Sequence, residues 1–290
     1  MSRTRHHNPR YASGSFALSY HLEMLSDRER VEQAKRAIRL AIAECGDAPV
    51  FCELGCGTGY FSIFAARHCR RVYAVENDPV VREVAQDNIR RLGLTGKIVL
   101  LEGDALSVPV PCEKIDILFC EMMSIWLITE PQVPVVRRWL TDLRSPIRCV
   151  IPSRVINMAE LAQIDYGFDE LEVRADLAQF SGVCAPRVMT ESRVVSEIVF
   201  GRPATLVDQM KGACEFQALV GGTANCARLS SIVEFFPGVN FFGTDTLMPA
   251  TIVPLMEDLA MTAGDRVIFE SIYRHRSELT AASFRAQIQS

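Results

Sequence analysis

One glycine-rich stretch decides the fold of this chain, Glu53-Leu54-Gly55-Cys56-Gly57-Thr58-Gly59. The residues before it, 50–54, form an apolar run that predicts a buried strand, and residues 59–68 predict a helix. Glycines let the backbone turn sharply and approach a ligand closely, while the helix N-terminus offers N–H groups without intrahelical partners. The stretch therefore predicts a cofactor-binding loop made by Glu53, Gly55, Cys56, Gly57 and Gly59.

Strand-like and helix-like segments alternate on both sides of this loop. Further strands are expected at residues 72–75, 98–102, 115–120 and 149–151, and helices at residues 79–92 and 133–143. An amphipathic helix is expected at residues 26–44, with Ser26 as its N-cap and Glu29 completing a capping box. Strands that are apolar throughout and separated by helices indicate a parallel sheet covered on both faces. We predict an N-terminal helical segment over residues 1–45 and an α/β, Rossmann-like domain over residues 46–151.

The pattern of predicted elements changes after Pro152. Short strand-like segments separated by turn residues follow at residues 155–162, 194–200, 213–219, 230–236, 251–255, 266–273 and 283–288. This pattern is typical of antiparallel strands in a barrel or sandwich. We therefore predict a β-barrel-like domain over residues 152–290, with no prediction for the order of its strands.

Composition limits the classes of function. The 290 residues are 49% hydrophobic and 23% charged, which is typical of a folded chain, and the net charge of -4 argues against nonspecific nucleic-acid binding. The apolar runs are too short for a transmembrane helix, and residues 1–10 lack the apolar core of a signal peptide, so a cytoplasmic protein is expected. The cysteines include no C-x-x-C pair, and Cys52, Cys120 and Cys149 lie in predicted strands, so neither a metal site nor a disulfide framework is expected.

Acidic residues at two further strand ends indicate the kind of cofactor. Glu76 ends the second strand, about twenty residues after the loop, where a carboxylate can bind both ribose hydroxyls. Asp104 and Ala105 follow the third strand, near the expected position of a bound base. A dinucleotide loop would have glycine where this chain has Tyr60. The loop instead resembles motif I of the Rossmann-fold S-adenosylmethionine-dependent methyltransferases, which implies S-adenosyl-L-methionine as the cofactor.

Two acids bracket an almost entirely apolar stretch after the fourth strand, Glu121 and Glu130. The carboxyl ends of parallel strands face the ligand crevice, so Glu121 is expected beside the cofactor. Two carboxylates in such a stretch repel each other and are costly to bury unless a cation lies between them. A guanidinium has the planar donor fork that satisfies both. The pair is therefore a candidate catalytic site for a guanidino acceptor.

This stretch resembles the double-glutamate loop of the protein arginine N-methyltransferases, with Glu121, Met123 and Glu130 at matching positions. Upstream, Tyr11 and the run His21-Leu22-Glu23-Met24-Leu25-Ser26-Asp27 resemble the N-terminal motif of that family. The resemblance implies that Tyr11 and Met123 contact the substrate and that Glu121 and Glu130 hold it. It also implies that the cofactor is bound by His21, Met24 and Arg30, with Arg30 on its carboxylate.

The chain departs from that family in three places. The family carries a Thr-His-Trp loop, and the best alignment of this chain with it places Thr246-Leu247-Met248 there. In the family a histidine helps hold the double-glutamate loop, and this chain has no evident replacement for it. The stretch 170–191 looks too short for the family's helical dimerisation arm, so we expect a monomer or a dimer through another surface. The second tyrosine of the N-terminal motif is replaced by Ser15.

Three classes of function stay open. The first is an N-methyltransferase acting on a guanidino group, either in a peptide or in a small molecule such as free arginine. The second is a methyltransferase of the same fold acting on a nitrogen or oxygen of another small metabolite. The third is a silent cofactor-binding scaffold, against which the two glutamates argue. A single residue can also have a structural role in place of a functional one. Glu130 precedes Pro131, for example, and could stabilise the start of a helix.

Overall fold

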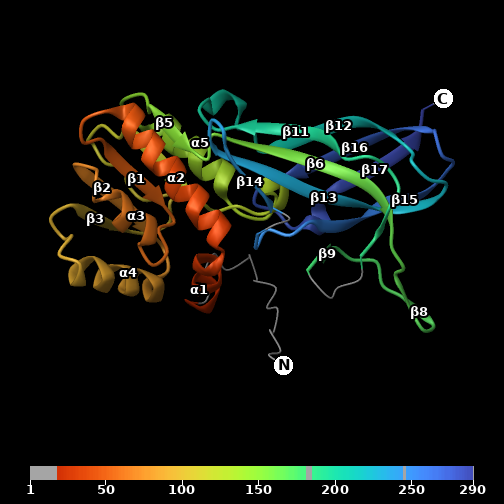
Figure 1. The fold of residues 1–290 in the computed structure, drawn as a ribbon, viewed down its shortest axis with the longest axis horizontal. Coiled ribbons are helices and arrows are strands. Elements are labelled where there is room, and N and C mark those ends of the chain that lie inside the picture. Colours follow the sequence, from red (N-terminus) through yellow and green to blue (C-terminus); the bar gives the residue numbers. More distant parts are fainter. Residues whose placement is uncertain (1–17, 181–184, 244–245, 290) are drawn as a thin grey trace.

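The computed structural model describes residues 18–180, 185–243 and 246–289. Figure 1 shows a parallel sheet with its helices at one end of the long axis and a set of long antiparallel strands at the other. The predicted substrate residue Tyr11 lies outside the described residues, as do Ser15 and Cys184.

The parallel sheet has five strands in the order β3-β2-β1-β4-β5. These are β1 (Val50–Leu54), β2 (Arg71–Glu76), β3 (Ile98–Glu102), β4 (Ile117–Cys120) and β5 (Cys149–Ile151). Every residue of β1 and β4 is buried, because helices cover both faces of the sheet. The strand order reverses between β1 and β4, where a crevice opens at the carboxyl ends of the strands in folds of this kind.

Five helices accompany this sheet: α1 (Leu18–Ser26), α2 (Arg28–Cys45), α3 (Tyr60–Ala65), α4 (Pro79–Arg91) and α5 (Gln132–Asp142). The prediction of Ser26 as the N-cap of one helix is wrong. Ser26 is the last residue of α1, and its hydroxyl donates to the main-chain oxygen of Leu22. Asp27 caps α2 instead, since its carboxylate accepts a hydrogen bond from the N–H of Arg30 at 3.2 Å.

The antiparallel region contains the longer strands β6 (Arg154–Gln163), β11 (Arg193–Val199), β12 (Gln209–Gln217), β13 (Gly222–Phe236), β15 (Thr251–Met261), β16 (Arg266–Arg274) and β17 (Ser283–Ile288). Shorter strands are β7 (Gly167–Phe168), β8 (Leu171–Glu172), β9 (Leu177–Ala178), β10 (Arg187–Val188) and β14 (Val239–Phe242). One sheet runs β10-β6-β13-β15-β9, with β11 beside β6 and β14 beside β13, and a second runs β12-β16-β17. Contacts of β11 with β12 and of β15 with β17 join these sheets into a barrel-like shape.

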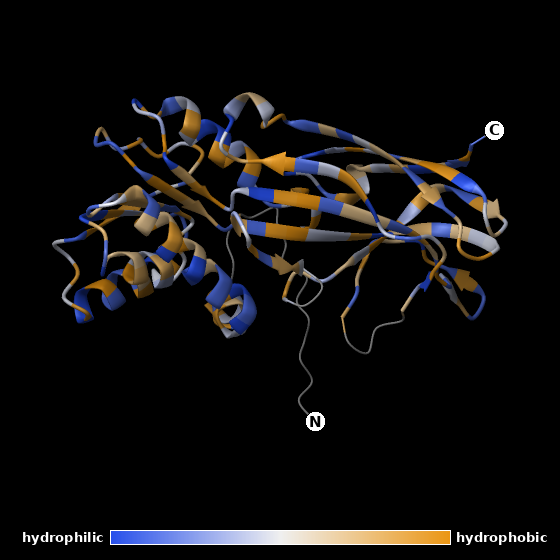
Figure 2. Cartoon of the chain, turned by 45° about the horizontal axis from the view of Figure 1, so that its top comes forward, coloured by the Kyte–Doolittle hydropathy of each residue, from blue (hydrophilic) through white to orange (hydrophobic). Residues whose placement is uncertain are grey.

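Strand β13 begins at Gly222, earlier than the predicted start at residue 230. Its first half contains small and polar residues with weak strand preference. Pairing with β6 on one side and β15 on the other keeps this half extended. Hydrophobic and hydrophilic residues alternate along these long strands in Figure 2, as expected when one face of a sheet is buried.

The two halves of the molecule share one hydrophobic core. At their junction the ring of Phe119 in β4 stacks on the ring of Phe235 in β13, with centroids 6.5 Å apart. The parallel strands end at Ile151 and the antiparallel strands begin at Arg154. Because the core runs across this junction, the domain boundaries at residues 45/46 and 151/152 stay predictions.

Three further observations concern the described part of the chain. Cys52, Cys120 and Cys149 lie buried in strands, as predicted. Within the described ranges, no group of three or more His, Cys, Asp or Glu side chains is arranged to bind a metal ion. None of the helices in these ranges combines the length and the apolar character needed to cross a bilayer.

Candidate active site

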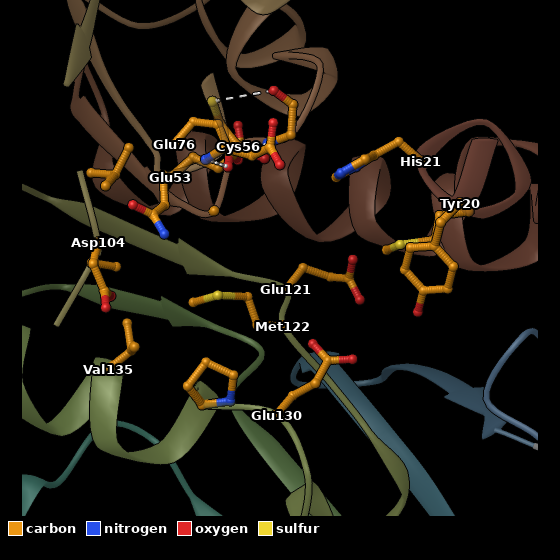
Figure 3. Close-up of a pocket in the computed structure, with 18 of the residues that line it drawn as sticks. Tyr20, His21, Glu53, Cys56, Glu76, Asp104, Glu121, Met122, Glu130 and Val135 are labelled. Carbon is orange, nitrogen blue, oxygen red and sulfur yellow. Dashed lines mark hydrogen bonds between the residues drawn. The ribbon is translucent and has the colours of Figure 1, made fainter. Parts of the chain in front are cut away.

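A cavity of about 460 Å³ opens where the parallel strands end. Its wall comes from α1, α2, the loops after β1, β2, β3 and β4, and the turn after β16 (Figure 3). This volume lies within the range of ~300–1,000 Å³ common for ligand sites. The cavity therefore coincides with the crevice expected from the strand order.

The glycine-rich loop after β1 forms one side of the cavity. Gly55 and Gly57 have φ values of +71° and +55°, in the left-handed region that favours glycine. A Cβ atom on Gly57 would lie 2.9 Å from Nδ1 of His21, and one on Gly55 would lie 3.1 Å from the sulfur of Met122. The left-handed backbone and these close side chains of α1 and of the loop after β4 together favour glycine at both positions.

Gly59 has a different place from the other loop glycines. It is the N-cap of α3 with φ +82°, and a Cβ added there would meet the Cβ of Ala85 at 3.4 Å. It does not line the cavity. Its location fits a role in packing α3 against α4.

Glu76, at the end of β2, links this loop to the next. One carboxylate oxygen accepts the N–H of Gly57 at 2.8 Å, and the other accepts the N–H of Asp78 at 2.9 Å. Burial raises the pKa of Glu76, while these main-chain hydrogen bonds oppose the increase. Each oxygen keeps a lone pair for a further donor. Asp104 and Ala105, after β3, line the same part of the wall.

Glu53 lies beneath the loop and is buried. It accepts a hydrogen bond from the hydroxyl of Ser62 in α3. Burial raises the pKa of Glu53 to about 8, although the hydrogen bonds from Ser62 oppose the increase. The neutral carboxyl thus contributes to holding β1 and α3 together under the cavity.

A buried cluster of three ionisable groups, Arg30, Glu121 and Glu130, forms the other end of the cavity. The guanidinium of Arg30, which is 4% exposed, forms an ion pair with Glu121. Figure 3 shows the carboxyl groups of Glu121 and Glu130 pointing into the same part of the cavity, near the ring of Tyr20. Nε of Arg30 is buried without a hydrogen-bond partner among the described residues. The sequence did not predict the Arg30–Glu121 pair, since 91 residues separate the two.

The second acid of the cluster is held in its neutral form. Glu130 is 6% exposed. Burial, with a smaller contribution from the charge of Glu121, raises the pKa of Glu130 to about 8, and Arg30 opposes the increase. Burial also raises the pKa of Glu121, although its pairing with Arg30 works in the other direction. The single guanidinium of Arg30 cannot neutralise two ionised carboxylates in a buried site.

The backbone between the two glutamates is strained and anchored in the barrel. Trp126 and Leu127 have φ values of +55° and +56°, which cost roughly 1–2 kcal/mol per non-glycine residue. The indole N–H of Trp126 donates to the main-chain oxygens of Met158 and Ser230, and its main-chain N–H donates to the hydroxyl of Ser231. These bonds to β6 and β13 hold the loop in its unusual conformation.

The turn after β16 supplies two more anchors. Nδ1 of His275 lies 2.7 Å from the main-chain oxygen of Leu127, and the N–H of Ser277 donates to the oxygen of Ile128 at 3.1 Å. A carbonyl oxygen only accepts, so Nδ1 carries the proton. Burial lowers the pKa of His275, which favours the neutral ring. The sequence had indicated no histidine for this loop, and no spacing pattern would have found His275.

Most predicted site residues line the cavity. Those that do are His21, Met24, Arg30, Glu53, Gly55, Cys56, Gly57, Glu76, Asp104, Ala105, Glu121 and Glu130. Met123 does not, because its side chain is 3% exposed and packs in the core, while its neighbour Met122 faces the cavity. Lining residues that the sequence did not indicate include Tyr20, Thr129, Arg276, Ser277 and Glu278.

The sequence has recognisable relatives. Residues 51–145 match a family model described as a methyltransferase domain. The chain is 31% identical over 238 residues to an uncharacterized protein of Methanothermobacter thermautotrophicus, which covers 82% of this chain and 86% of that protein. It is also 31% identical over 151 residues to a probable protein arginine N-methyltransferase 6 of Arabidopsis thaliana. That match covers 50% of this chain and only 33% of the plant protein.

Solved structures resemble the whole chain. Protein arginine methyltransferase 10 of Arabidopsis thaliana superposes with a TM-score of 0.77 at 15% identity, covering 97% of this chain and 95% of that one. The Trypanosoma brucei PRMT1 enzyme–prozyme complex with AdoHcy gives a TM-score of 0.74 at 18% identity, covering 96% and 98%. At such identities the likeness establishes the fold alone. It confirms the predicted class, a Rossmann-like domain followed by a barrel-like one.

Proposed function

The chain belongs to the class I S-adenosylmethionine-dependent methyltransferases related to the protein arginine N-methyltransferases, and on that premise we propose that it methylates a guanidino nitrogen. S-adenosyl-L-methionine is the cofactor, and its sulfonium supplies a methyl group that is already electrophilic.

The loop end of the cavity has the groups that this cofactor requires. Gly55 and Gly57 line this end of the cavity, and their left-handed backbone is one that glycine adopts readily. Glu76 keeps a lone pair on each oxygen for the ribose hydroxyls, and Asp104 is assigned to the base. The unpartnered Nε of Arg30 is a buried donor suited to the amino-acid carboxylate of the cofactor. These features support a fit between the residues and S-adenosylmethionine.

The observation that carries the acceptor assignment is the charge of the buried cluster. Arg30 compensates only one negative charge in this buried cluster, so Glu130 stays neutral in the ligand-free protein and would ionise only when a second cation enters the site. A cationic acceptor would supply the missing charge, and a guanidinium would offer several N–H donors in a plane. A neutral amine or hydroxyl would not compensate this charge.

The geometry suggests how the residues would assist transfer. An arginine guanidinium is protonated at any working pH, and its nitrogens are poor nucleophiles while the charge is delocalised. Carboxylates on one side of the group would localise charge away from the attacking nitrogen and orient it for in-line displacement. That nitrogen gains the methyl group and loses a proton, which Glu130 is the candidate to accept.

Methyl transfer from labelled S-adenosylmethionine to L-arginine and to arginine-containing peptides tests the proposal, with mass spectrometry to locate the methyl group. We expect guanidino methylation by wild type and a loss of roughly a hundredfold in Glu130→Gln, the scale for one preorganised electrostatic group. Glu257→Gln is the matched control, because Glu257 is an exposed acid of β15 outside the cavity. Methylation of neutral amines or hydroxyls alone would favour a metabolite methyltransferase instead.

A further inference from the structure

Arg276 occupies an unusual position in the cavity wall. It lies in the turn between β16 and the 3-10 helix Leu279–Ala281, with φ +59°. Such a conformation is uncommon for a residue other than glycine and persists where surrounding contacts impose it. Here the residues before and after Arg276 impose it, because His275 and Ser277 each form a hydrogen bond with the loop between the two glutamates. The turn therefore presents Arg276 in a defined place relative to that loop.

The charge of Arg276 is unused within the described part of the chain, where it has no ion pair and no side-chain hydrogen bond. The other arginine of the wall, Arg30, is buried and paired with Glu121. Glu278 lies two residues after Arg276, lines the same wall, and likewise has no ion pair among the described residues. Among the residues that the structure describes, this turn thus presents one cation and one anion, each without an ion pair, to the cavity.

We propose that Arg276 binds a carboxylate of the acceptor and that the acceptor is a free amino acid carrying a guanidino group. This inference rests on the proposed function. Free arginine has three charged groups. Glu121 and Glu130 would complement its guanidinium. Arg276 would complement its α-carboxylate, and Glu278 its α-ammonium group. An internal arginine of a peptide has neither α-charge, and its cationic neighbours in a basic peptide would be repelled by Arg276.

The expected energy of the contact is moderate. A guanidinium can bind a carboxylate through two parallel hydrogen bonds, which favours arginine for this task. Arg276 is exposed, so solvent screens part of the attraction. We therefore expect the contact to change kcat/KM by about tenfold rather than by several orders of magnitude.

The test compares L-arginine with agmatine, which is arginine without its carboxylate. Wild type should have a kcat/KM about tenfold higher for L-arginine than for agmatine. In Arg276→Gln this preference should disappear, because activity on L-arginine falls while activity on agmatine does not. Arg276→Lys should retain part of it, since it keeps the charge without the fork. Arg274→Gln removes an exposed arginine of β16 outside the cavity wall and should behave as wild type.

Other outcomes separate this inference from the proposed function. Equal use of L-arginine and agmatine by wild type would overturn the carboxylate contact and leave guanidino methylation intact. A similar loss on both acceptors in Arg276→Gln, with an unchanged melting temperature, would also overturn it. Efficient methylation of end-blocked peptides with an internal arginine would assign the site to peptides. Failure to methylate any guanidino compound would overturn both proposals.

Discussion

Nδ1 of His275 lies 2.7 Å from the main-chain oxygen of Leu127, although 148 residues separate the two in the sequence. Leu127 belongs to the loop between Glu121 and Glu130, whereas His275 follows the last residue of β16. The contact therefore joins the antiparallel region to a loop of the parallel-sheet region. Both halves of the molecule build the acidic end of the cavity.

We predict that His275 positions this loop. His275→Ala should lower kcat for methyl transfer by about tenfold or more, because a small displacement of a positioned group is costly to catalysis. Cofactor affinity should remain near that of wild type. His275→Asn should recover part of the activity, since its amide N–H₂ can take the place of the Nδ1 donor. Equal loss in both variants would indicate that the ring serves packing alone.

The two glutamates should differ when each is replaced by glutamine. Glu121 is paired with Arg30, so Glu121→Gln should weaken both cofactor binding and turnover. Glu130 has no ion pair with any residue in the described ranges, so Glu130→Gln should bind the cofactor within a few-fold of wild type while turnover falls by roughly a hundredfold. Calorimetric titration with S-adenosylhomocysteine and single-turnover assays would measure the two effects. Identical behaviour of the variants would contradict the assigned coupling.

The ribose assignment can be tested by Glu76→Ala. Loss of its hydrogen bonds should weaken S-adenosylmethionine binding by about ten- to a hundredfold. Glu102→Ala provides the control, because Glu102 faces Glu76 in the register of β2 and β3 but has an exposed side chain paired with Arg82. If Glu102→Ala weakened binding as much as Glu76→Ala, the loss would come from removing a negative charge in this region and not from losing a contact with the ribose.

The stability of the ligand-free protein should fall as the pH rises from about 5 to about 8. The pKa of Glu130 is raised from 4.5 to about 8, so the unfolded state loses its proton at a lower pH than the folded state. The stabilising contribution of this group is complete below 4.5 and is lost as the pH rises through the folded pKa. Glu53 contributes in the same direction. The melting temperature of Glu130→Gln should therefore depend less on pH than that of wild type, and a steeper dependence would contradict the raised pKa.

The assembly stays a prediction. The described residues between 170 and 191 form the short strands β8, β9 and β10 and contain no helix. We therefore expect a monomer, or a dimer formed through another surface, in solution. Light scattering measures the mass, and a dimer formed through a helical arm inserted in this stretch would contradict the expectation.

Local sequence determined the end of the cavity that the glycine-rich loop forms. A strand, a glycine-rich loop and a helix follow one another within 20 residues, and the predicted bounds of β3 and β5 coincide with the observed strands. Glu76 and Asp104 could be placed because parallel strands all end at the same edge of a sheet. Such features depend on residues close together in the chain, so spacing and residue type are enough to predict them.

Tertiary structure alone decided how the acidic end is built. Arg30 meets Glu121 and His275 meets Leu127 across 91 and 148 residues, and no local pattern encodes either contact. Met122 rather than Met123 faces the cavity because the chain leaves the regular alternation of β4 and the long side chain of Met122 packs against Gly55. These choices depend on how whole sheets pack against each other, since burial, left-handed backbone and long-range hydrogen bonds arise only when both halves are in place.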